Sequence, residues 1–182
     1  MIVELRQYTL RSGQWDVLAE LFDRALAEGQ EAVGMTVLGW FRDLDDPDRF
    51  VWLRAFPDMS QRAHALAAFY GGPVWAQHRK AANATMIDSE NVLLLRPPRR
   101  EEGFSLDPGG RLVASIHQFS EPVTDGDVER LERKLGPVRA TLVTEERPND
   151  FPSLPIREGE HVVVRLSERA DPGADEVLRL EA

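Results

Sequence analysis

The segments LGWFR at residues 38–42 and FVWLR at residues 50–54 decide the fold, because each contains Trp-x-Arg within a run of strand-forming residues. The segment DLDDPD between them, residues 43–48, is typical of a tight turn, since Asp side chains hydrogen-bond nearby amides and Pro fixes φ. The sequence therefore predicts a β-hairpin. Calcium binding is the other interpretation of these aspartates, but the segment lacks the glycine and terminal glutamate of an EF-hand, so a solvated turn is favoured.

The segments around the hairpin have the periodicities of further strands and helices. Apolar side chains alternate in the strand segments and recur every three or four residues in the helical ones. The predicted elements are a strand at 2–10, a helix at 14–29, the hairpin at 36–56, a helix at 59–70 capped by Asp58, a short helix from Pro73 and a buried strand at 92–95. The order β-α-β-β-α-β is that of a ferredoxin-like module, in which two helices cover one face of a four-stranded antiparallel sheet.

The second half of the chain repeats the first in a shortened form. Gln7-Tyr8 matches Gln118-Phe119, 111 residues later, whereas Val92-Leu93 matches Val177-Leu178 only 85 residues later. About 26 residues are therefore missing where the second helix would be. We predict a ferredoxin-like module at 1–98, a linker rich in Pro and Gly at 99–110, and a degenerate second module at 111–182 with one helix at 125–135.

Two such modules are expected to pack face to face, and the resemblance of the segments at 48–54, 69–75 and 149–160 to a known family implies that they form one α+β barrel within the chain. The missing helix should leave part of the second sheet uncovered, and the consecutive valines at 162–164 place apolar side chains on both faces of one strand. We therefore expect the uncovered face to pair with a second chain in a homodimer. The alternative is a barrel formed between the first modules of two chains.

Composition excludes several classes of protein. The 182 residues contain no cysteine, which excludes disulfides, thiolate nucleophiles and thiolate metal sites. No apolar run is long enough to cross a bilayer, and the charged start of the chain does not resemble a signal peptide, so we expect a cytoplasmic protein without membrane contact. A net charge of −9 disfavours nucleic acid as a partner.

Motifs that would define a reaction are absent. The sequence contains no Gly-x-Ser-x-Gly, Walker or Gly-x-Gly-x-x-Gly pattern, and no pair of histidines has the spacing of a helical zinc motif, so no metal is expected. His64 is assigned to the solvent side of its helix and His117 to a structural role. His78 follows Trp75 by one helical turn, and a structural role competes with a role as haem ligand or proton shuttle.

Aromatic and cationic residues form the best candidate binding site. In a strand, Trp40 and Arg42 share a face, as do Trp52 and Arg54, and such a surface suits a planar apolar molecule with a carboxylate or phenolate. The candidate ligand-binding residues are Tyr8, Trp40, Arg42, Trp52, Arg54, Trp75 and His78. By the alternative interpretation the tryptophans are core residues and the arginines pair with acids such as Glu4 or Asp43.

Longer segments of the chain resemble the NIPSNAP family. They are FYGGPVW at 69–75 with the nearby His78-Arg79, NATMI at 83–87, DRFVWLR at 48–54 and NDFPSLPIREGE at 149–160. The resemblance implies a dimeric α+β barrel, in which two ferredoxin-like sheets pack face to face with helices outside. It implies no agreed catalytic motif, although members are linked to vesicle trafficking or mitochondrial signalling and the wider superfamily includes monooxygenases and haem-degrading enzymes.

Three functions follow as hypotheses. The leading one is binding of a small aromatic or apolar molecule, with cofactor-independent oxygenase or isomerase chemistry as its extension. The others are a non-catalytic assembly protein and a haem protein that uses His78. A ligand binder requires a pocket of roughly a few hundred cubic ångströms lined by Trp40, Trp52 or Tyr8, whereas an assembly protein can fill its barrel with side chains.

Overall fold

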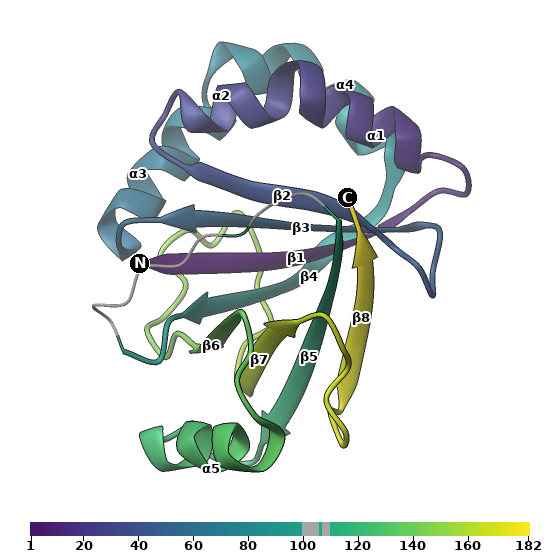
Figure 1. Cartoon of the computed structure of the whole chain (residues 1–182). Helices are drawn as coiled ribbons and strands as arrows, with labels where there is room; N and C mark the ends of the chain where they lie inside the picture. The colour runs from purple at the N-terminus through teal and green to yellow at the C-terminus, as the bar shows by residue number, and fades with distance from the viewer. Residues whose placement is uncertain (100–105, 107–109) are drawn as a thin grey trace.

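The computed structural model describes residues 1–99, 106 and 110–182. Its elements are β1 (Ile2–Leu10), α1 (Trp15–Leu21), the π-helix η1 (Phe22–Leu26), α2 (Ala27–Glu31), β2 (Thr36–Asp43), β3 (Arg49–Phe56), α3 (Met59–Tyr70), α4 (Pro73–Thr85), β4 (Met86–Arg96), β5 (Arg111–Phe119), α5 (Asp125–Leu135), β6 (Ala140–Thr144), β7 (His161–Ser167) and β8 (Glu176–Glu181). The strands close into one barrel in the order β1-β3-β2-β8-β5-β7-β6-β4 (Figure 1). The prediction of an α+β barrel closed within a single chain is confirmed.

The predicted hairpin is formed by β2 and β3. Trp40 lies opposite Trp52, and Arg42 lies opposite Phe50. A β-bulge between Val37 and Gly39 shifts the pairing by one residue, and Gly39 adopts φ of 144°, a conformation that disfavours a side chain. The bulge interrupts the alternation, so Leu38 points into the barrel whereas Trp40, two residues later, lies on the outer face.

The interior of the barrel is filled with aliphatic side chains and Phe41. Alternate residues of the strands point inward, which is why one face of each strand is apolar. The buried interior residues are Val3, Leu5, Leu38, Phe41, Val51, Leu53, Ala55, Leu93, Leu95, Leu112, Ala114, Ile116, Leu142, Val162, Val164, Leu166, Leu178 and Leu180. A binding site must therefore be sought on the outer face of the strands.

Helices cover the outer face of the barrel on two sides. The helices from α1 to α4 lie over β1, β2 and β3, whereas α5 lies at the opposite end of the molecule (Figure 1). A second core, rich in aromatic residues, fills the space between the larger helical layer and the sheet. The predicted helices at 59–70 and 125–135 match α3 and α5.

Two helices extend beyond their predicted bounds, and α3 buries a charged residue. The first helix contains the π-helical turn η1 and continues to Glu31, and the short helix from Pro73 extends to Thr85. On α3 the buried stripe includes the charged residue Arg62. Tertiary partners explain the last difference, because a buried carboxylate holds Arg62 on the inner side. The linker predicted at 99–110 falls largely outside the described residues.

The second sheet is not left uncovered in the single chain. Val163 on its outer face is fully buried, packed with Val128 of α5. The loop between β7 and β8 covers the neighbouring part, where Asp171 accepts a hydrogen bond from Nη1 of Arg165 at 2.9 Å and donates its amide to Oγ of Ser115 at 2.9 Å. The expectation of an apolar face in water was therefore wrong, and the predicted homodimer loses that reason.

A capping interaction at the start of α3 gives a first test of the fold. Oδ1 of Asp58 accepts a hydrogen bond from the amide of Gln61 at 2.8 Å. Asp58→Ala should lower the free energy of unfolding by about 1 kcal/mol, because one amide at the helix start loses its acceptor. Urea denaturation measures the difference. Asp58→Asn keeps an acceptor and should stay within about 0.5 kcal/mol of the original protein; an equal loss in both variants would contradict the capping role.

Candidate functional site

Four charged side chains form a buried cluster between the outer face of the sheet and α3. Glu4 lies at its centre on β1: Oε2 accepts hydrogen bonds from Nη1 of Arg6 at 2.7 Å and from Nε of Arg54 at 2.8 Å. Its other oxygen, Oε1, accepts one from Nε of Arg62 at 2.8 Å. All four side chains are at most 1% exposed. Antiparallel pairing of Glu4 with Arg54 across β1 and β3 fixes this geometry.

The cluster contains more positive than negative charge. Burial alone would raise the pKa of Glu4, but the guanidinium groups of Arg54, Arg6 and Arg62 outweigh it and hold this pKa well below its usual range. Arg62 has a second carboxylate partner, Asp150, whose side chain is 26% exposed. Within this network of described residues, three guanidinium cations therefore face two carboxylates, and only one of these is fully buried.

An aromatic cavity adjoins the charged cluster. It has a volume of about 30 Å³, room for about one water-sized molecule. Its lining residues come from the sheet and from every helix of the larger layer, and they are Tyr8, Leu18, Phe22, Leu26, Gln30, Trp52, Phe69, Tyr70, Trp75, Ala82 and Met86. The π-helical turn η1 contributes Phe22 and Leu26, and such turns occur frequently at functional sites.

Two hydrogen-bond donors lie in the wall of this cavity. The hydroxyl oxygen of Tyr8 accepts a hydrogen bond from Nε of Arg6 at 3.0 Å, which leaves its own proton available. Burial raises the pKa of the Tyr8 phenol although the charge of Arg6 opposes the shift, so the phenol is protonated at neutral pH. Nε1 of Trp52 is buried and has no hydrogen-bond partner among the described residues.

The structure brings together some of the residues predicted from the sequence. Tyr8, Trp52 and Trp75 line the cavity. Arg54 lies beside it, with its guanidinium 5.0 Å from the Trp52 ring and its Nη1 donating to Oε1 of Gln30 at 2.8 Å. The core interpretation also holds in part, because Trp52 is buried in the aromatic core and Arg54 pairs with Glu4.

Three other candidate residues lie apart from the cavity. Trp40 is on the predicted face but packs on Phe22 outside the lining. Arg42 stacks on Trp15 at 4.1 Å and pairs with Asp16 at 2.7 Å. His78 lies on α4 and does not line the cavity. Reasoning from single strands could not separate these residues from the others, because the helices above the sheet decide which outer positions adjoin a cavity.

Sequence reasoning missed the helical and loop components of the site. Arg62, Gln30 and Asp150 contact the cluster from α3, α2 and the loop after β6. One signal was present for Arg62: it stands three residues after Met59 and four before Leu66, and is thus an arginine in the apolar stripe of α3. No comparable signal identifies Asp150, since its loop lies far from α3 in the sequence.

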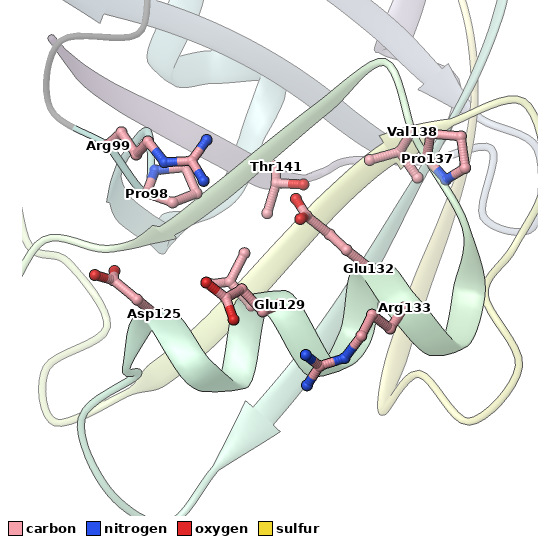
Figure 2. A pocket seen from close by; sticks show the side chains of 10 residues that line it. Pro98, Arg99, Asp125, Glu129, Glu132, Arg133, Pro137, Val138 and Thr141 are labelled. Carbon is pink, nitrogen blue, oxygen red and sulfur yellow. The ribbon is translucent and has the colours of Figure 1, made fainter.

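A larger hollow lies beside α5, far from the aromatic cavity in the fold. It measures about 750 Å³ and is lined in part by Asp125, Glu129 and Glu132, which point from one face of α5 toward Arg99 and Thr141 (Figure 2). These three carboxylates are exposed. A solvated helix face with charges of both signs is common on protein surfaces, so the small aromatic cavity is the better candidate site despite its size.

Metal and membrane sites were sought in the described part of the chain. No group of three or more His, Asp or Glu side chains there is arranged to hold a metal ion. None of the helices within residues 1–99 and 110–182 has the length and apolarity needed to span a bilayer.

The fold and the site define an α+β barrel protein with a buried arginine cluster under one helical layer. The sequence model of the NIPSNAP family matches residues 3–99, more than half of the chain. The chain therefore belongs to the NIPSNAP family, as its sequence segments predicted. No functionally curated protein matches it.

Solved structures show the same fold. An uncharacterized NIPSNAP-like domain protein from Burkholderia xenovorans is 27% identical with a TM-score of 0.50, covering 59% of this chain and 91% of that one. An Agrobacterium tumefaciens protein is 21% identical with a TM-score of 0.51, covering 57% and 99%. A candidate monooxygenase from Lactobacillus acidophilus is only 11% identical. The alignment covers 98% of this chain and 92% of that protein, with a TM-score of 0.54.

Proposed function

We propose that this protein binds a small molecule that combines an aromatic or apolar part with an anionic group, between the helices from α1 to α4 and the outer face of β1 and β3. The observation that carries the proposal is the excess of guanidinium groups in the buried cluster beside an aromatic cavity. Buried charge is costly, and packing alone does not require a third arginine around one carboxylate. An anionic ligand would supply these guanidinium groups with a second carboxylate at the buried cluster, where Asp150 is partly exposed.

The chemistry of the cavity wall supports an extension to catalysis. The protonated phenol of Tyr8 and the indole N–H of Trp52 can both donate to an oxygen atom of a ligand. Two donors beside a cation suit an oxygen that gains negative charge, such as that of an enolate or phenolate. We propose cofactor-independent isomerase or oxygenase chemistry as the reaction class. In such a reaction Tyr8 would donate its hydrogen bond to the ligand oxygen that gains negative charge.

The cavity does not reach the size expected of a ligand binder, so the proposed binding requires a conformational change. A volume of about 30 Å³ is far below the few hundred cubic ångströms expected of a ligand pocket. Binding therefore has to widen the space between the helices and the sheet. A haem would require a still larger opening, and His78 lies outside the cavity lining, so haem binding through His78 is the weaker hypothesis.

A non-catalytic assembly protein is the second candidate function. The filled barrel interior favours it, since an interior packed with side chains is what such a protein needs. We further infer that the barrel consists of tandem ferredoxin-like modules. The matching strand orders β4-β1-β3-β2 and β8-β5-β7-β6 support this inference. A homodimer and a cytoplasmic location stay predictions from the sequence.

Binding can be tested with the freshly purified protein. Native mass spectrometry should detect a retained small molecule, and calorimetric titration with aromatic carboxylates should give a binding isotherm. Arg6→Met should weaken that binding about tenfold or more, because a hydrogen bond to a charged group is lost. Arg42→Met is the matched control, since Arg42 lies on the same sheet face but outside the cavity. Equal affinity of the Arg6 variant, or no binding by the original protein, would reject the proposed function.

A further inference from the structure

A strap formed by residues 145–160, between β6 and β7, packs on the aromatic core under the helical layer of the first half through Phe151, Leu154 and Ile156. Its two ends are fixed to β4: the amide of Glu145 donates to the carbonyl of Leu94 at 2.9 Å, and the amide of Arg157 donates to that of Val92 at 2.9 Å. Between these anchors the strap reaches α3. The second half of the chain thus contributes a segment to the site in the first half.

Two consecutive strap residues occupy the edge of the site. Asp150 pairs with Nη1 of Arg62, the guanidinium whose Nε binds Glu4 in the buried cluster. The ring of Phe151 stacks on Tyr70, with centroids 6.3 Å apart and planes inclined by 27°. Tyr70 itself lines the aromatic cavity. A carboxylate on the arginine cluster and a ring on the aromatic wall are the two features that the proposed ligand requires.

The strap is built to present these two side chains. Oδ1 of Asn149 accepts a hydrogen bond from the amide of Phe151 at 3.1 Å, and its Nδ2 donates to the carbonyl of Leu154 at 2.9 Å. Nη1 of Arg62 also donates to Oδ1 of Asn149 at 3.1 Å. The turn around Asn149 therefore fixes the directions of Asp150 and Phe151, while Leu154 packs on the aromatic core.

We propose that Asp150-Phe151 is an internal mimic of the ligand, which therefore is an aryl carboxylate, and that binding displaces the strap. This inference rests on the proposed function. The Asp150 side chain is 26% exposed, so its pair with Arg62 is screened by water and is weaker than the fully buried pair between Arg62 and Glu4. A ligand carboxylate can compete for Arg62 while Glu4 stays in place. The strap is thus an autoinhibitory contact that sets the apparent affinity of the site.

The test compares strap variants in the full-length chain. Probes are ω-phenylalkanoates of increasing chain length, with the corresponding uncharged amides as controls. Asp150→Asn removes the competing charge and should tighten binding of the best acid about tenfold, because a larger fraction of molecules becomes competent to bind. Phe151→Ala should act in the same direction. Glu158→Gln removes an exposed carboxylate from the same strap and should leave the affinity unchanged.

Hydrogen exchange of the strap provides a second measurement. Adding the acid probe to the original protein should increase the hydrogen exchange of backbone N–H groups within residues 149–156. The uncharged amide probe should not change this exchange. If the original protein binds the acid but Asp150→Asn and Phe151→Ala bind it equally well, or if the acid protects the strap, the mimic is rejected and the proposed function stands. If no probe binds to the original protein or to either strap variant, both proposals fail.

Discussion

Glu4→Gln is expected to lower the free energy of unfolding by about 3–5 kcal/mol, which is a large part of the roughly 5–15 kcal/mol that stabilises a domain. The substitution preserves shape but leaves Arg6, Arg54 and Arg62 in a buried space without the carboxylate that they share. Among the described residues of this network, the partly exposed Asp150 would then be the one carboxylate facing three cations. Urea denaturation followed by circular dichroism measures the loss.

Arg54→Met is the informative comparison, because it removes one cation from a cluster that has a surplus. Glu4 would keep Arg6 and Arg62 as partners, and the methionine side chain retains most of the apolar contact. The expected loss is about 1 kcal/mol, well below that of Glu4→Gln, with part of it due to Gln30 losing its donor. A loss in Arg54→Met as large as in Glu4→Gln would show that the two residues act as an isolated ion pair.

The pH dependence of Glu4→Gln follows from the sign of the pKa shift. The pKa of Glu4 is lowered in the folded chain, so its stabilising contribution is present above the pKa of an unfolded glutamate, about 4.3. The contribution declines as the pH falls below that value, because the unfolded chain takes up a proton that the folded chain does not. The stability difference between the two proteins should therefore be constant near neutral pH and shrink below about pH 4.

The chain truncated after Pro98 is expected to lose its independent fold as a monomer. Each apolar side chain on the inner face of the first four strands contributes about 1.5–3 kcal/mol through burial, and the second half of the chain supplies the opposite wall of the barrel. The residues exposed by the truncation are Val3, Leu5, Leu38, Phe41, Val51, Leu53, Leu93 and Leu95. Their combined loss is on the order of 10 kcal/mol, comparable with the whole stability of a domain.

Analytical ultracentrifugation and thermal denaturation of residues 1–98 measure this effect. The fragment should either aggregate or pair with a second copy that replaces the missing wall. A monomeric fragment that unfolds cooperatively would show that the inner face does not need the second half.

The local elements of the fold could be predicted from the sequence, because each depends on neighbours in the chain. The hairpin follows from alternating strand residues around an Asp- and Pro-rich turn, and α3 begins after its predicted cap Asp58. That Trp40 shares a face with Arg42, and Trp52 with Arg54, was predictable for the same reason, whereas the structure decided that this face is the outer one. The barrel was predictable from the family resemblance together with the internal repeat, which indicated a second sheet.

The sequence by itself determined which segments form strands and helices, the order of these elements and the family. It also indicated the set of aromatic and cationic residues that forms the candidate site. The tertiary structure alone decided which of these residues meet. Arg62 turns inward because Glu4 attracts it from β1, and Asp150 reaches Arg62 because both ends of its strap are fixed to β4. Secondary structure depends on residues a few positions apart, whereas a buried charged cluster depends on partners from distant segments whose distance only the packed chain fixes.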